Sequence, residues 1–249
     1  MSDKKLAIVT GASKGLGLAM ATELYKKGFS LVTISRSNRI SLAPDTNGKV
    51  QTFKHISADL SNTSGTDNAI KKLREALKPN IKQLILINNA GTVGPIANTS
   101  NLDNINEISQ SFTLNVSSVM ALTAVVLQHS TAHNISTRVL NISSGAGRNP
   151  MPGWGVYCAT KAALDHYTRV LSAEHPEIKS VSLAPGVIDT DMQTTIRQSN
   201  EQDFPGLGNF IAMYEHGQLS SPESTAEKII SHLLSNVFGN SVIDDIRKY

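Results

Sequence analysis

Short apolar runs alternate with longer amphipathic stretches along this chain of 249 residues. Each apolar run has the length of a buried strand, and each stretch between them repeats with the period of a helix. Strand, helix, strand in regular alternation implies right-handed crossovers and a parallel sheet covered by helices on both faces. The pattern predicts strands at 6–10, 30–35, 51–56, 84–89, 138–143, 179–184 and 241–244, and helices at 16–27, 66–78, 103–129, 157–173 and 223–235.

Composition sets limits on the class of protein. Hydrophobic residues make up 40% of the chain and charged residues 17%, which is typical of a globular protein, and the length suits one α/β domain over residues 1–249. The net charge of +3 comes without a basic block, so nucleic acid is not an expected partner. The single cysteine, Cys158, excludes an internal disulfide. We expect no apolar run of membrane-spanning length and no signal-peptide core, which predicts a cytoplasmic protein.

A glycine-rich turn follows the first predicted strand. The run Thr-Gly-Ala-Ser-Lys-Gly-Leu-Gly occupies residues 10–17 and leads into a helix. Strand, glycine turn and helix in this order are typical of dinucleotide binding, because the helix N-terminus offers free N–H groups to a phosphate. Gly11 permits the tight turn, Gly15 lets the backbone approach a pyrophosphate, and Gly17 allows close helix packing. The fold predicted is therefore a Rossmann-type doubly wound sheet of about seven strands.

The end of the second predicted strand indicates which dinucleotide binds. An acidic residue there would accept hydrogen bonds from the ribose 2′-OH of NAD. This chain has Ser35 and Arg36 instead, with Lys14 in the glycine turn. Two cations without a carboxylate suit a 2′-phosphate, so the sequence favours NADP(H). The alternative is that Arg36 is a solvated surface charge.

Three residues in the second half suggest proton transfer. Tyr157 and Lys161 lie four residues apart on a predicted helix, and Ser144 ends a predicted strand. Positions four apart share a helix face, so the ammonium is expected to lower the pKa of the phenol. A serine hydroxyl beside the phenol would hold a carbonyl oxygen. Ser143 competes for this role, but strand alternation turns it to the other face.

Several of these features follow predicted strands. Gly17, residues 88–91, Ser144 and Pro185-Gly186 all come after strand ends. Ligands of doubly wound sheets bind beyond the carboxyl ends of the strands, so these residues are expected to share one crevice.

These motifs together resemble the short-chain dehydrogenase/reductases over essentially the whole chain. The matching pieces are residues 10–17, Asn-Asn-Ala-Gly at 88–91, Asn115, Ser144, Tyr157, Lys161 and Pro-Gly at 185–186. Residues 141–150, 153–161 and 184–193 look like the benzil reductase and sepiapterin reductase branch, and residues 196–222 are similar to the benzil reductase group. The resemblance implies an NADPH-dependent oxidoreductase that reduces a ketone or 1,2-diketone to a hydroxy compound.

Roles carry over from the resemblance residue by residue. It implies that Tyr157 is the general acid, Lys161 binds the nicotinamide ribose, Ser144 polarises the carbonyl and Asn115 holds a water. The alternative for Asn115 is a solvent-facing helix residue. Asp59 matches an adenine contact but is equally plausible as a helix cap. The implied cofactor contacts are Gly11, Ser13, Lys14, Gly15, Leu16, Gly17, Arg36, Asp59, Leu60, Asn89, Ala90, Gly91, Tyr157, Lys161, Pro185, Gly186, Val187, Ile188 and Thr190.

Substrate contacts are expected from two loops. The loop 147–156 carries Arg148, Met151 and Trp154, and the insertion after residue 186 carries Met192, Phe210 and Met213. Aromatic and thioether side chains suit a partly hydrophobic carbonyl compound, so Ser144, Met151, Trp154, Tyr157, Met192 and Met213 are the predicted substrate contacts. Alternatively these side chains only pack a lid or a subunit interface.

Further expectations concern the insertion, its acids and possible partners. The segment 189–222 is long for a connection and is predicted to be a substrate lid.

Asp189 and Asp191 are interpreted as turn and helix-start acids, so no metal is expected. The resemblance implies a homodimer or homotetramer. Two other functions remain open: a pterin-carbonyl reductase, with Asp191 or Glu215 as acidic anchor, and a non-catalytic NADP(H) sensor.

Overall fold

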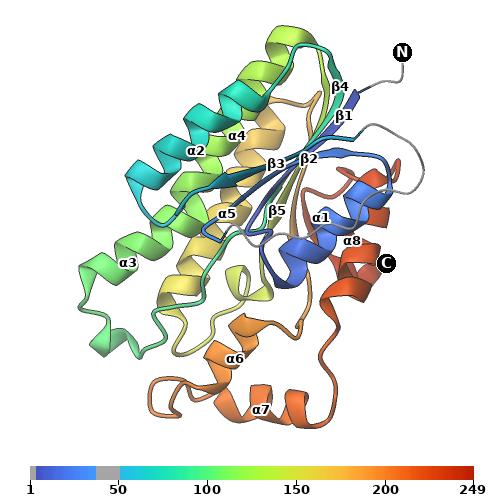
Figure 1. Ribbon diagram of the computed structural model, residues 1–249. Helices are drawn as coiled ribbons and strands as arrows, with labels where there is room; N and C mark the ends of the chain where they lie inside the picture. The colour runs from blue at the N-terminus through green and yellow to red at the C-terminus, as the bar shows by residue number, and fades with distance from the viewer. Residues whose placement is uncertain (1–3, 38–50) are drawn as a thin grey trace.

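The computed structural model describes residues 4–37 and 51–249, which are built around a parallel sheet of seven strands (Figure 1). The order β3-β2-β1-β4-β5-β6-β7 confirms the predicted doubly wound fold. Because the chain leaves β1 first toward β2 and later returns beside it as β4, the topological switch point lies between β1 and β4. The strands are β1 (Lys4–Thr10), β2 (Ser30–Ser35), β3 (Phe53–Ser57), β4 (Ile81–Asn88), β5 (Ser136–Ile142), β6 (Lys179–Ala184) and β7 (Ile243–Asp245).

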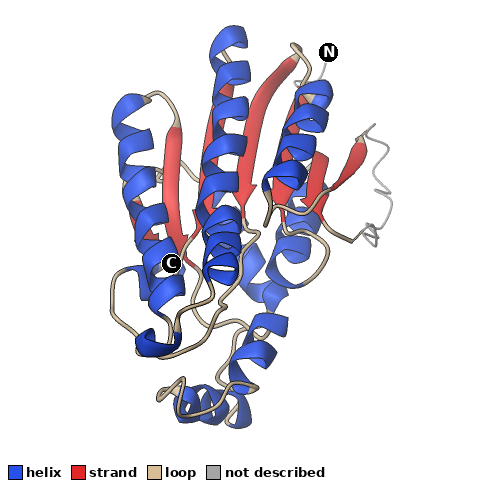
Figure 2. Ribbon diagram, turned by 90° about the vertical axis from the view of Figure 1, so that its left-hand side faces the viewer, coloured by secondary structure: helices blue, strands red, loops and turns tan. Residues whose placement is uncertain are grey.

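Helices cover both faces of the sheet, as predicted (Figures 1 and 2). Successive strand side chains point to opposite faces. Ala7 and Val9 therefore enter one core cluster with α1 and α8, while Leu6 and Ile8 enter another with α2 and α4. The covering helices are α1 (Gly15–Lys26), α2 (Thr63–Ala76), α4 (Ser118–His133), α5 (Gly155–Glu174) and α8 (Pro222–Leu234).

The helix predicted over 103–129 is interrupted. The structure has α3 (Ile105–Phe112), a π-helical turn (Thr113–Ser117) and then α4. Two side chains bond back to backbone carbonyls around this turn, Thr113 to Ser109 at 2.8 Å and Ser118 to Leu114 at 2.8 Å. Such side-chain bonds compete with the regular helical ladder, which accounts for the local widening.

This helical stretch also corrects the expectation about apolar runs. Residues Ile105–His133 have the length and mean hydropathy, 1.4, of a membrane-crossing helix. In the structure Leu122, Val125 and Val126 of this stretch lie buried in the core cluster beside the sheet. A core helix of a globular fold passes the same test of length and composition, and this stretch has the packing of one.

The segment 189–222 contains two helices that the sequence pattern did not predict, α6 (Asp191–Arg197) and α7 (Leu207–Glu215). Its ends lie side by side, because the Asp189 N–H donates to the Ser220 carbonyl at 3.0 Å and the Ser220 N–H donates to the Val187 carbonyl at 3.1 Å. The strand arrowheads point toward this segment, which lies beyond the carboxyl edge of the sheet (Figure 2).

Candidate active site

The glycine turn between β1 and α1 leaves no room for side chains at two positions. A Cβ on Gly17 would lie 2.3 Å from the Gly11 carbonyl oxygen and 2.4 Å from Asn89 Nδ2. Gly11 itself has a φ of +66° and lies against Ala90. The first turn of α1 receives no side-chain cap from any described residue, so its N–H groups remain available to an anion.

Asn89 ties the end of β4 to this turn. Its Nδ2 donates to the Thr10 carbonyl at 3.0 Å and to the Gly11 carbonyl at 3.3 Å. The Thr10 hydroxyl in turn accepts from the N–H groups of Asn89 and Ala90, each at 3.0 Å. The glycine turn and the Asn-Asn-Ala-Gly motif therefore form one unit, as the convergence at strand ends predicts.

Asn88 has a different role in the structure. Its buried side chain donates to Asn141 Oδ1 at 2.8 Å and to the Thr123 hydroxyl at 3.2 Å. These bonds join β4 to β5 and α4 inside the protein. Asn88 is thus part of the sheet framework.

Arg36 and Asp59 lie near one another where β2 and β3 end. Arg36 is exposed, whereas Asp59 is partly buried and accepts from the Ser61 N–H at 3.0 Å and the Ser61 hydroxyl at 2.8 Å. Burial opposes ionisation of Asp59, but the bonds from Ser61 and the charge of Arg36 together hold its pKa below the usual value. The helix-cap interpretation of Asp59 is wrong, because Asn62 caps α2 by accepting from the Gly65 N–H at 2.8 Å. Leu60, beside Asp59, is buried.

The glycine turn also contacts the start of the 189–222 segment. The Lys14 ammonium forms an ion pair with the Asp191 carboxylate at the beginning of α6. A Cβ on Gly15 would lie 3.2 Å from the methyl group of Thr190. Two of the predicted cofactor contacts, Lys14 and Thr190, thus lie where this segment meets the turn.

Tyr157, Lys161 and Ser144 come together, as the spacing predicts. Tyr157 and Lys161 are both buried on α5, with Lys161 Nζ 5.6 Å from the centre of the tyrosine ring. Ser144 lies just after the end of β5. It caps the 3-10 turn Gly145–Gly147 by accepting from the Ala146 N–H at 3.1 Å. Its side chain also interacts with the Tyr157 phenol and opposes the rise in the pKa of that phenol.

The ionisation of this cluster differs from the expectation. Burial raises the pKa of Tyr157 to about 12, against the opposing effect of the bond with Ser144. Burial lowers the pKa of Lys161 to about 8, against the opposing charge of Asp165. The expectation of a lowered tyrosine pKa is wrong for this structure, because desolvation of the phenolate outweighs the interactions that favour it. The ammonium lies over the ring face and donates to the Ile142 carbonyl at 2.7 Å.

Asn115 lies beside Lys161 within the π-helical turn. It is 1% exposed, so the solvent-facing alternative is wrong. Its Nδ2 donates to the Thr92 carbonyl at 2.9 Å and the Thr160 hydroxyl at 3.0 Å, and its Oδ1 accepts from the Thr92 N–H at 2.9 Å. A Cβ on Gly91 would lie 3.2 Å from Asn115 Oδ1 and 3.7 Å from Lys161 Nζ. Gly91, Asn115 and Lys161 therefore adjoin.

Sequence reasoning missed a buried carboxylate behind this cluster. Asp165 accepts from the hydroxyls of Ser143 and Ser182, each at 2.6 Å, and from Arg148 Nε at 3.0 Å. Arg148 was considered for the substrate pocket, but the structure commits it to this ion pair. Ser143 donates to Asp165 while Ser144 interacts with Tyr157, so the two neighbouring serines serve different partners.

Trp154 occupies the centre of an aromatic cluster over the site. It stacks on Phe204 at 4.8 Å between ring centres, and its edge meets Tyr157 at 5.4 Å. At 4% exposed it is packed inside the protein, with Met151 and Met192 partly buried against the cluster. These residues pack against the 189–222 segment, and their predicted contacts with substrate stay a prediction. No hydrogen-bond partner for Trp154 Nε1 occurs within residues 4–37 and 51–249.

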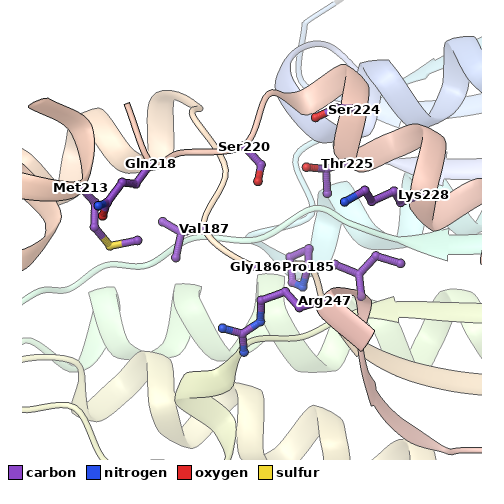
Figure 3. Close-up of a pocket in the computed structure, with 11 residues that line it drawn as sticks. Pro185, Gly186, Val187, Met213, Gln218, Ser220, Ser224, Thr225, Lys228 and Arg247 are labelled. Carbon is purple, nitrogen blue, oxygen red and sulfur yellow. The ribbon is translucent and has the colours of Figure 1, made fainter. Parts of the chain in front are cut away.

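A cavity of about 190 Å³ lies beside Pro185, Gly186 and Val187 (Figure 3). Val187 and Met213 approach it from one side, and the first turns of α8 from the other (Figure 3). Arg247, which also lines the cavity, is paired with Asp245 through a 2.6 Å contact. Met213 is thus placed at this cavity and apart from the aromatic cluster. Ile188, the next predicted contact, is buried.

Comparison with known proteins agrees with this geometry. A family profile described as short chain dehydrogenase matches residues 5–201. The chain belongs to the short-chain dehydrogenase family. It is therefore an oxidoreductase, and its family uses a nicotinamide cofactor.

Individual relatives indicate which branch of the family this chain resembles. The chain is 36% identical over 239 residues to a benzil reductase ((S)-benzoin forming) of Bacillus cereus, covering 94% of this chain and 96% of the relative. It is 33% identical to a sepiapterin reductase of Meriones unguiculatus, covering 94% and 92%. Among solved structures, the KRED1-Pglu enzyme superposes with a TM-score of 0.82 at 29% identity, covering 97% and 100%. The resemblance of this short-chain dehydrogenase to the benzil and sepiapterin reductase branch is confirmed.

Proposed function

We propose that this short-chain dehydrogenase is an NADPH-dependent carbonyl reductase that converts a ketone or benzil-like 1,2-diketone to a hydroxy compound. One observation carries the proposal: the buried Tyr157 and Lys161 and the partly buried Ser144 form a single cluster on the strand-end side where the glycine turn also lies. The similarity to benzil reductases from two Bacillus species supports the choice of substrate class.

The residues around the glycine turn fit a dinucleotide. The tight turn that Gly11 and Gly17 permit and the uncapped start of α1 suit a pyrophosphate, and Arg36 suits a 2′-phosphate. Lys161, which donates to the Ile142 carbonyl, would bond the nicotinamide ribose after leaving that carbonyl. A bound reduced nicotinamide supplies hydride to the carbonyl carbon.

The protein's own groups supply the proton and stabilise the charge. Because its pKa is raised, Tyr157 stays protonated at neutral pH and can donate its phenolic proton to the oxygen of the reduced carbonyl. The Ser144 hydroxyl donates a hydrogen bond to the same oxygen and orients it. The Lys161 ammonium stabilises the phenolate that proton transfer leaves on Tyr157.

The pterin-carbonyl reductase alternative is supported by the sepiapterin reductase relatives. The two acidic anchors considered for it are poorly suited: Asp191 is paired with Lys14, and Glu215 is exposed at the end of α7. A non-catalytic sensor would not need the proton-transfer residues, all of which this chain has. We therefore place the diketone reductase first.

A substrate panel tests the function. NADPH oxidation is followed by absorbance with 1,2-diketones, aromatic ketones, sepiapterin and sugars. Turnover of diketones above sepiapterin supports the proposal. Preference for sepiapterin would favour the pterin enzyme, and binding of NADPH without any turnover would favour the sensor.

Arg36 is expected to decide the choice between NADPH and NADH. Replacing Arg36 with aspartate removes the cation expected at the 2′-phosphate and adds an acceptor for a free 2′-OH. The ratio of kcat/KM with NADPH to kcat/KM with NADH should therefore fall at least about tenfold, which is the effect of losing a charged hydrogen bond. Lys54→Asp on the exposed side of β3 is the control, since it changes the same charge. An unchanged cofactor ratio in Arg36→Asp would reject the NADP(H) assignment.

The charge of Lys161 predicts an alkaline limit to reduction. Its pKa lies at about 8, so the ammonium is lost as pH rises through that value, and the phenolate on Tyr157 then loses its counter-charge. The kcat/KM for NADPH, which reports the free enzyme, is expected to decline with an apparent pKa near 8. A profile that stays flat to pH 10 would contradict this role of Lys161.

A further inference from the structure

The buried carboxylate of Asp165 has no part in the proton transfer described so far, yet it is bonded to the active-site frame. It is 3% exposed and accepts three hydrogen bonds of 2.6–3.0 Å, from Ser143, Ser182 and Arg148. Because a buried ionised carboxylate is costly unless it is well paired, this set of donors indicates a charge that the fold holds in place.

Two of the three donors come from either side of Ser144, and the third, Ser182, lies on β6. Ser143 immediately precedes it at the end of β5, and Arg148 follows the 3-10 turn Gly145–Gly147 that Ser144 caps. Asp165 itself lies on α5, one helical turn beyond Lys161. A single carboxylate thus fastens the loop that carries Ser144 to the helix that carries Tyr157 and Lys161.

We propose that Asp165 is a positioning residue of this active site, which fixes Ser144 relative to Tyr157 and places a negative charge one turn from Lys161. This inference rests on the proposed reductase function. It differs from a purely structural role, because the charge of Asp165 is used as well as its hydrogen bonds.

Few other charges reach this cluster within the described residues. Lys161 faces it from α5, and Arg148 faces it from the loop after β5. From β7, Asp245 interacts with Arg148 and is itself paired with Arg247. Asp165 is the carboxylate whose charge acts on Lys161, so its neutralisation should make the ammonium easier to deprotonate.

The test compares variants that separate charge from packing. Asp165→Asn keeps the shape and loses the charge, and Asp165→Glu keeps the charge. Thr168→Val is the matched control, because Thr168 also joins α5 to β5, through the Asn141 amide at 2.9 Å, but on the next turn of the helix. Melting temperature, kcat and the pH profile of kcat/KM for NADPH are measured for each.

Asp165→Asn is expected to lower kcat about tenfold per folded molecule, as for a misplaced catalytic group, and to move the alkaline limb to lower pH. Asp165→Glu should leave the alkaline limb of the pH profile in place. Thr168→Val should lower the melting temperature without moving the alkaline limb. The inference is overturned if Asp165→Asn lowers the melting temperature but leaves kcat and the alkaline limb unchanged. It is also overturned if Thr168→Val moves the alkaline limb as far as Asp165→Asn does.

Two further measurements keep the test decisive. If Asp165→Asn does not fold, Ser143→Ala replaces it: a several-fold fall in kcat at unchanged NADPH affinity supports the inference, and an unchanged kcat overturns it. Turnover of the unmodified enzyme is measured first. Its absence would defeat the proposed function, whereas an active parent with an unaffected Asp165→Asn variant would defeat only this inference.

Discussion

Replacing Tyr157 with phenylalanine is expected to lower kcat by about 10²–10⁴-fold, the usual contribution of a general acid. The phenol is buried beside Ser144, and burial raises its pKa to about 12, so at neutral pH it carries the proton that the proposed reduction would consume. Phenylalanine keeps the ring that contacts Trp154 but removes the hydroxyl. Steady-state NADPH oxidation measures the loss, and NADPH fluorescence should show nearly unchanged cofactor affinity.

Tyr167 offers a matched control for this variant. It lies on the same helix, its pKa is also raised by burial, and the side chain that opposes this rise is Thr123, where Tyr157 has Ser144. Tyr167→Phe should retain turnover close to that of the parent enzyme. Equal losses in the two variants, or near-normal turnover in Tyr157→Phe, would refute the proton-donor role.

Replacing Trp154 with alanine is expected to reduce the free energy of unfolding by about 3–5 kcal/mol, the range for deleting a large buried aromatic side chain. Trp154 contacts Phe204, Phe210 and Tyr157, so its loss leaves a cavity between the 189–222 segment and α5. Denaturant unfolding measures the stability. The KM for the carbonyl substrate should also rise, since the aromatic wall above Tyr157 is lost.

Trp154→Phe separates packing from hydrogen bonding in this cluster. The indole nitrogen has no partner in the described part of the chain, so losing its N–H should cost little. Phenylalanine can keep the stacked contact with Phe204, and the variant should lose less than half of the stability lost by Trp154→Ala. Equal destabilisation by the two changes would show that an indole hydrogen bond matters.

The sequence pattern predicted the sheet and the main helices because each strand is a short apolar run between helical stretches. It did not predict α6 and α7, since these short helices lie among glycines and prolines such as Pro205, Gly206 and Gly217 and pack mainly through Trp154 and Phe204. The interruption of the helix over 103–129 was missed for another reason. It depends on where single hydroxyl groups bond to the backbone.

The candidate site was predictable where spacing alone brings residues together. Tyr157 and Lys161 share a helix face, and Gly17 and Asn89 meet because their strands are neighbours. The ionisation of Tyr157 was not predictable, because it depends on burial, which spacing does not reveal. The partners of Asp165 come from β5, β6 and the loop after β5, so the carboxylate could be recognised only after the strands were in register.

The π-helical turn makes the helical stretch sensitive to insertions and deletions. One extra residue in a turn rotates everything after it by about 100° relative to an uninterrupted α-helix. Leu122 and Val126 therefore point into the core while Asn115 bonds to Thr92 and Thr160 at the active site. Deleting a single amino acid here would straighten the helix, but either the asparagine or the apolar stripe would then face the wrong way. The chain length between these positions is thus as much a requirement of the enzyme as the identity of the residues.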